Sequence, residues 1–94
     1  MTTLHLINKP GQPFTLCQQA LAPDDSILLI EDGVYLLQAA AEQIKKLACT
    51  VSCYCLETDH LARGVTPSTL PVTAVDYGQF VHLTTEHDKV ISWF

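Results

Sequence analysis

The chain has 94 residues and a formal net charge of −5. This length suits one domain, and a negative chain without a Lys/Arg cluster is a poor candidate for direct nucleic-acid binding. Hydrophobic residues make up 48% and charged residues only 16%, against about 25% charged in a typical domain. We therefore expect part of the apolar surface to be buried between subunits.

The sequence also indicates where the protein works. No apolar run approaches the length of a membrane span, and the N-terminus lacks a basic region followed by an apolar stretch. We therefore expect a cytoplasmic protein without a membrane contact. In that compartment its four cysteines are expected to be thiols rather than disulfides.

The first predicted strand covers residues 2–7, where polar and apolar residues alternate. A Pro-Gly loop follows at residues 8–11. The next helix has two possible starts. Pro13 is suited to the first helical position, whereas Thr15 could cap the helix and form a capping box with Gln18. Residues 22–25 end this helix.

The central prediction concerns residues 27–35. Four consecutive aliphatic residues, Ile27 to Ile30, indicate a strand buried on both faces. Asp32 is expected to cap the next helix, and Gly33 to let the chain turn sharply off the strand. The apolar positions of residues 34–47 recur at helical spacing and predict one amphipathic helix.

The remaining sequence predicts two more helices and three more strands. Residues 48–56 read as a third strand, and a short helix capped by Thr58 or Asp59 should end at Gly64. Residues 72–75 and 90–94 read as strands, with Trp93 packed or at an interface. Asp76 and Gln79 predict a capping box for a helix with an apolar face of Tyr77, Phe80, Val81 and Thr84.

Buried strands that alternate with amphipathic helices are typical of βαβ units. We therefore predict an α/β fold: a single small domain over residues 1–94, with a mostly parallel sheet of four to five strands between helices.

The cysteines are the first candidates for chemistry. Cys49, Cys53 and Cys55 occupy alternate positions of the predicted third strand and should point to one face. A zinc site would need further ligands, and only His60 is near in sequence. Buried structural thiols are the favoured interpretation.

Cys17 follows the first strand and its loop, where α/β folds place their chemistry. If Thr15 caps the helix, Cys17 lies in its first turn, and the free backbone N–H groups favour a reactive thiolate. The helical pattern also places Cys17 in the middle of an apolar arc, which indicates an inert core thiol. Both interpretations remain open at this stage.

The acidic pair Glu31-Asp32 could serve as an acid/base or Mg²⁺ site. Helix capping by Asp32 and solvent exposure of Glu31 explain the pair more simply. The four histidines show no spacing that pairs them.

Taken together, the chain resembles the DsrH/TusB family, which belongs to the DsrE-like superfamily. The matching segments run in order over nearly the whole chain. They are Thr3-Leu4-His5, Asn8-Lys9, the segment from Leu28 to Tyr35, Ala62-Arg63-Gly64, Val75-Asp76-Tyr77, Phe80-Val81, Leu83-Thr84 and Trp93.

The resemblance implies a subunit of a sulfur-relay complex that serves tRNA wobble-uridine 2-thiolation or dissimilatory sulfur oxidation. It implies a heterohexamer with related DsrE/TusD-like and DsrF/TusC-like subunits, together with proteins that donate and accept sulfur. Cys17 matches the place of the family's relay cysteine and would carry sulfur as a persulfide, without a metal or an organic cofactor. The alternative is a structural subunit whose partner carries the relay cysteine.

Overall fold

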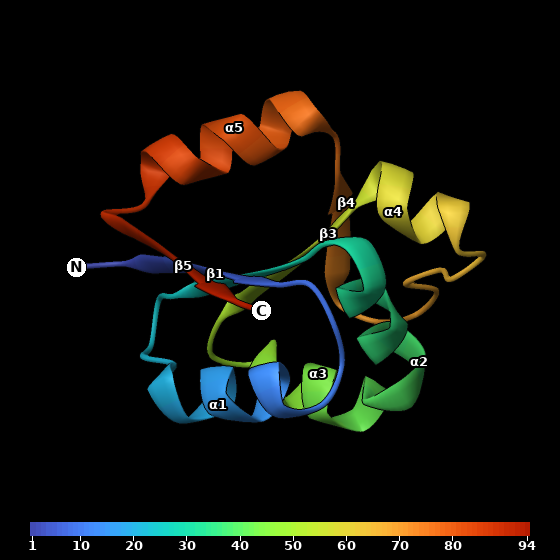
Figure 1. The fold of residues 1–94 in the computed structure, drawn as a ribbon. Coiled ribbons are helices and arrows are strands. Elements are labelled where there is room, and N and C mark those ends of the chain that lie inside the picture. Colours follow the sequence, from blue (N-terminus) through green and yellow to red (C-terminus); the bar gives the residue numbers. More distant parts are fainter.

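Five parallel strands form one sheet in the order β4-β3-β2-β1-β5 in the computed structural model, which describes residues 1–94 (Figure 1). The predicted α/β class and mainly parallel sheet are therefore confirmed. The strands are β1 (Thr3–Ile7), β2 (Ser26–Leu29), β3 (Ser52–Leu56), β4 (Val72–Val75) and β5 (Lys89–Trp93).

The helices cover the two faces of this sheet unequally (Figure 1). One face carries α1 (Gln12–Ala20), α2 (Leu36–Ala39) and α3 (Ala41–Leu47), and we call it the three-helix face. The other face is crossed by α5 (Tyr77–Glu86), and we call it the one-helix face. The short α4 (Glu57–Ala62) lies beside the carboxyl end of β3. None of the helices has the length and apolar character that a membrane crossing requires.

Each face of the sheet has its own apolar core. Fourteen buried residues form the core under the three-helix face, and seven form the core under α5. All four residues of β2 are buried, as expected for a strand in the middle of a sheet with both faces covered. The prediction from the aliphatic run Ile27 to Ile30 is thus confirmed.

The prediction of a single helix over residues 34–47 is wrong. A 3₁₀ helix, η1 (Glu31–Tyr35), leads into α2, and Ala40 separates α2 from α3 with φ −134° and ψ 35°. Asp32 therefore lies within η1 and does not cap a helix. The expected inward positions still hold, since Leu36, Leu37 and Ile44 are buried. The side chains predicted to face the core therefore do so, although they belong to short separate segments and not to one helix.

Gly33 has a different role from the one predicted. Its φ is not positive, so the turn does not require glycine. Instead, a Cβ at this position would overlap the backbone carbonyl of Ile7. Gly33 allows η1 to pack directly against the end of β1.

The third strand is shorter than predicted. β3 begins at Ser52, because Thr50 and Val51 still donate their backbone N–H groups to the carbonyl of Leu47 at the end of α3. Residues 48–51 consequently form a turn. Cys49 lies outside the strand, contrary to the prediction.

Two of the predicted helix ends are confirmed. Asp76 and Gln79 form a complete capping box at the start of α5. Gly64, with φ +64°, follows the end of α4. The caps proposed at Thr58 or Asp59 are wrong, because α4 already begins at Glu57.

Candidate functional site

Cys17 lies inside the molecule. It is the sixth residue of α1, which begins at Gln12 with Pro13 in its first turn and without a side-chain cap. Phe14 and Cys17 face the core, and the Cys17 side chain is 0% exposed. Neighbouring Leu16 faces solvent instead. The side of α1 that carries Cys17 is therefore the side that packs on the sheet.

This environment disfavours the thiolate form. Burial raises the pKa of the Cys17 thiol to about 12, and the negative charge of Asp25 and nearby Cys53 add to the effect. The start of α1 at Thr15, which would have placed Cys17 in the first turn, is wrong; the hydroxyl of Thr15 merely donates to the Gly11 carbonyl at 3.4 Å. At neutral pH Cys17 is consequently a neutral thiol.

The other cysteines divide into one exposed and two buried thiols. Cys53 and Cys55 are buried on the three-helix face, and desolvation raises the pKa of each to about 11. Cys49 is exposed in the turn after α3. The three side chains therefore do not share one face, because Cys49 is not part of β3.

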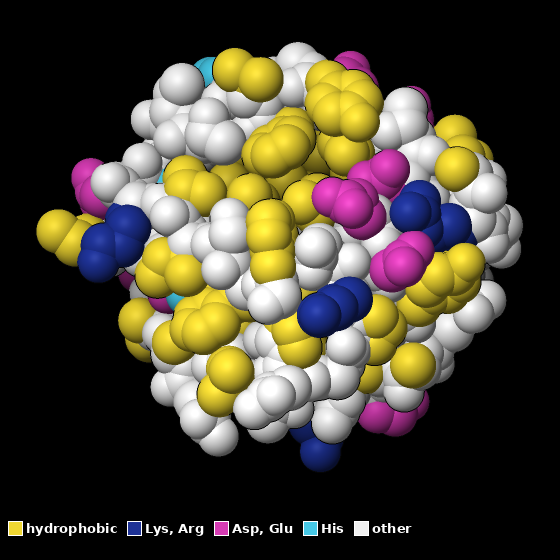
Figure 2. Space-filling view, viewed as in Figure 1, with side chains coloured by type: hydrophobic (Ala, Val, Ile, Leu, Met, Phe, Trp, Pro, Cys, Tyr) yellow, Lys and Arg dark blue, Asp and Glu magenta, His cyan; other side chains and the backbone are white.

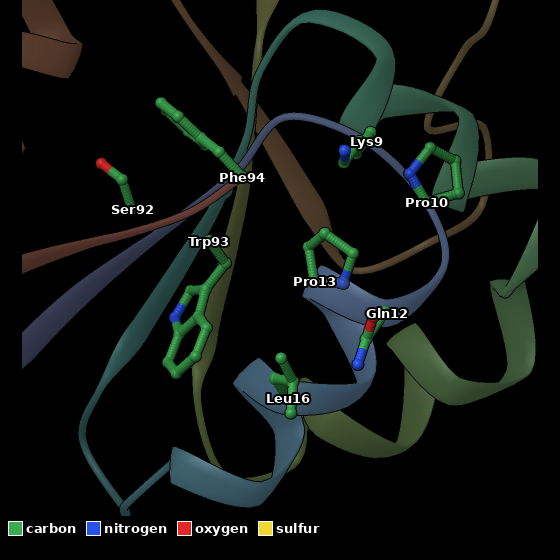
Figure 3. Close-up of a pocket in the computed structure, with 8 residues that line it drawn as sticks. All are labelled: Lys9, Pro10, Gln12, Pro13, Leu16, Ser92, Trp93 and Phe94. Atoms are coloured by element: carbon green, nitrogen blue, oxygen red, sulfur yellow. The ribbon is translucent and has the colours of Figure 1, made fainter.

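The largest cavity, of about 480 Å³, opens at the carboxyl ends of β1 and β5 (Figure 3). β1 is followed by α1 on the three-helix face, whereas β5 is preceded by α5, which crosses the other face. Lys9 is the one charged residue of the cavity lining, and Trp93 lies opposite Pro13 and Leu16, whereas the Phe94 ring points away from them. No cysteine lines this cavity, and of the three cavities only a smaller one, of about 240 Å³, includes a cysteine, Cys53. None opens onto Cys17.

A buried polar network, which the sequence did not indicate, lies beside the largest cavity. The indole N–H of Trp93 donates to Nδ1 of His5 at 3.0 Å, so Nδ1 carries no proton. The proton of the neutral ring is therefore on Nε2, which donates to the Asp25 carboxylate at 2.9 Å. His5 and Asp25 are only 1% and 4% exposed.

Asp25, just before β2, accepts hydrogen bonds from β1 and from the loop that follows α1. Burial on its own would raise the pKa of this carboxyl group. Hydrogen bonds from His5 and from the backbone N–H groups of Ala22 and Thr3 outweigh burial and hold the pKa below its usual value. The sequence showed only a Pro-Asp-Asp turn here, because a pairing between residues 20 positions apart leaves no local pattern.

The acidic pair after β2 belongs to a surface cluster. Asp32 accepts a hydrogen bond from Nε of Arg63 at 2.8 Å, and the Asp59 carboxylate accepts from the backbone N–H of Glu31 at 2.7 Å. The ion pair with Arg63 raises the pKa of the guanidinium. Asp32 is thus used to join η1 to α4.

Two solved structures share this fold. Protein Tm0979 from Thermotoga maritima is 23% identical, with a TM-score of 0.61 over 88% of this chain and 92% of that one. The ychN protein from E. coli is 18% identical, with a TM-score of 0.63 over 97% of both chains. These likenesses define the fold of a small parallel α/β protein.

Sequence comparison then defines the family. Residues 10–90 match the DsrH family, described as DsrH like protein. Protein TusB of Pectobacterium parmentieri is 38% identical over 71 residues, which are 73% of this chain and 75% of that protein. Protein TusB of Buchnera aphidicola is 33% identical over 96% of this chain and 99% of that protein. The chain belongs to the DsrH family, as the resemblance implied.

Proposed function

We propose that the chain is a structural subunit of a cytoplasmic sulfur-relay complex that serves wobble-uridine 2-thiolation of tRNA. Membership of the DsrH family and the relatives named Protein TusB support this assignment. The proposed partners are DsrE/TusD-like and DsrF/TusC-like subunits in a heterohexamer. One of these partners carries the relay cysteine and exchanges sulfur with the donor and acceptor proteins.

One observation supports the structural role over a carrier role: the thiol of Cys17 is completely buried and none of the three cavities reaches it. In sulfur transfer, a cysteine thiolate attacks the outer sulfur of a donor persulfide. The acceptor then becomes the persulfide and the donor leaves as a thiolate. Both the access and the charge that this reaction needs are lacking at Cys17 in this conformation.

The carrier role of Cys17 stays a prediction as the second candidate. Its support is position, since Cys17 lies in the helix that follows the first strand, the place that the family resemblance assigns to a relay cysteine. Such a role would require α1 to move away from the sheet, either spontaneously or on contact with a partner.

Intact mass after incubation with a persulfide donor distinguishes the two roles. Exposed Cys49 would react nonspecifically, so the experiment uses Cys49→Ser protein and the double variant Cys17→Ser/Cys49→Ser, each alone and mixed with the partner subunits. We expect no added sulfur on either variant. Added sulfur that disappears with Cys17→Ser would overturn the structural role and establish the carrier.

A further inference from the structure

The one-helix face and the neighbouring α4 leave large apolar side chains uncovered. Tyr77 and Val81 of α5 are 58% and 61% exposed, and Leu61 of α4 is 64% exposed. The expected apolar face of α5 is therefore only partly turned inward, where Phe80 and buried Leu83 pack on the sheet. Large exposed apolar side chains that gather in one region mark interaction sites.

A groove lies in the same region, between α4 and α5 at the carboxyl ends of β2 and β3. Its volume is about 330 Å³. Ile30 and Leu56 belong to the core beneath it, and Tyr77 and Phe80 come from α5. Glu31 and Asp59 complete the lining. We call it the α4–α5 groove.

The α4–α5 groove is acidic along one side. Figure 2 shows hydrophobic side chains at the top of the molecule bordered by acidic groups and one cationic group. Asp32, with its carboxylate on Nε of Arg63, and Asp59, 3.8 Å from Nη1 of Arg63, share this single cation. The exposed Glu31 side chain has no cationic partner. Two carboxylates thus share the Arg63 guanidinium, and the uncompensated charge of Glu31 lies at the groove.

The surface therefore combines an apolar cleft, an exposed tyrosine and an uncompensated carboxylate. A second copy of this chain docked through the same surface would place acid against acid, because a two-fold contact joins identical patches. A nucleic-acid backbone or an anionic lipid surface would be repelled in the same way. The complementary occupant is a protein segment with an apolar side chain beside a Lys or Arg.

We propose that the α4–α5 groove docks a partner subunit through such a segment, with its apolar side chain between Tyr77 and Phe80 and its cation on Glu31. This inference rests on the proposed function, because it takes the chain to be a subunit of a larger complex. It adds which surface meets the partner and what chemistry the partner must present.

The test measures the affinity of this chain for the DsrE/TusD-like and DsrF/TusC-like subunits, with Glu31→Lys and Tyr77→Asp as the groove variants, because both side chains line the groove and are exposed. Glu42→Lys on α3 and Leu16→Asp on α1 are matched controls, since these side chains are also exposed but lie on the three-helix side. Circular dichroism and thermal unfolding check that each variant is folded. All four substitutions change exposed side chains, so the fold should be kept.

We expect each groove variant to weaken association at least tenfold and each control to change it less than twofold. The groove contact should also weaken with added salt in the wild type, and less so in Glu31→Lys. Wild-type affinity in both groove variants would overturn the docking site while leaving the proposed subunit role intact. A wild-type chain that binds neither subunit would overturn both proposals.

Discussion

The two faces of the sheet differ in how completely the chain covers them. Fourteen buried residues, among them Cys17, Cys53 and Cys55, form the core of the three-helix face. Under α5 there are seven buried residues, and α5 itself exposes Tyr77 and Val81. The larger core and the three buried thiols thus lie under the three-helix face. The one-helix face is where the molecule has apolar surface left for a partner.

The two sides of the sheet should differ most in how they tolerate an added methyl group. Gly33→Ala would place a Cβ against the carbonyl of Ile7, and because backbone must move we expect a loss of more than about 4 kcal/mol or failure to fold. Gly78→Ala in α5 meets only the Asp76 carboxylate at 3.3 Å and should stay within about 1 kcal/mol of wild type. Urea unfolding measures both, and a tolerated Gly33→Ala would contradict the close approach of η1 to β1.

Removing core volume gives the next largest effect. Ile44→Ala shortens a side chain of α3 that is 0% exposed, whereas Leu83→Ala shortens a side chain of α5 that is 8% exposed. We expect losses of about 3 and about 2 kcal/mol, because the more open site can relax or admit water. Equal losses, or a larger one at Leu83, would mean that the two faces are equally well packed.

The Asp25 network provides a pH-dependent test. Asp25→Asn should cost about 2 kcal/mol, because a carboxylate that accepts three hydrogen bonds is replaced by a weaker acceptor. The folded pKa of Asp25 is lowered, so its contribution is present above the unfolded pKa and is lost as pH falls through the folded value. Unfolding measured between pH 7 and pH 3 should therefore show a smaller acid loss in the variant. If the stability of wild type and variant fell in parallel with pH, Asp25 would not be the source of the acid sensitivity.

The capping box of α5 is expected to have a smaller effect. Asp76→Ala removes the acceptor for the backbone N–H of Gln79, at 2.8 Å, and should cost about 1 kcal/mol. Hydrogen exchange should rise at the start of α5 and remain unchanged in α1. A loss of hydrogen-exchange protection in both helices would show that the two faces of the sheet are not independent.

The smallest structural perturbation is the labelling of thiols. In the native protein at pH 8, a maleimide should modify Cys49 quickly and the three buried cysteines only after unfolding. Mass spectrometry counts the modified sites. Rapid native labelling of Cys17 would indicate that α1 opens, and would favour its carrier role.

Much of the fold could be predicted because its signals are local. The aliphatic run before Glu31 marks a central strand, and the spacing of Asp76 and Gln79 defines a helix start. The break at Ala40 could not be predicted, because no proline or glycine marks it and the sequence favours a continuous helix. The turn at residues 48–51 contains the β-branched Thr50 and Val51, so its structure is decided by the hydrogen bonds to the end of α3 and not by propensity.

The candidate site divides in the same way. The sequence predicted the position of Cys17 after the first strand. The burial of Cys17 could not be predicted, because it depends on where α1 begins and on how α1 packs on the sheet. The pairing of His5 with Asp25 and Trp93 joins three segments far apart in the sequence. The α4–α5 groove likewise arises only when η1, α4 and α5 come together.

The pairing of β5 with β1 has a consequence for how the chain folds as it is synthesised. β1, β2 and β3 are linked by successive crossovers, so these strands can pair while later residues are still within the ribosome. β5 pairs along the whole of β1, from Thr3 with Lys89 to Ile7 with Trp93, and contacts of such sequence separation form slowly. A ribosome-bound chain therefore leaves one edge of β1 unpaired until α5 has crossed the sheet, and an unpaired strand edge is a template for association with other chains.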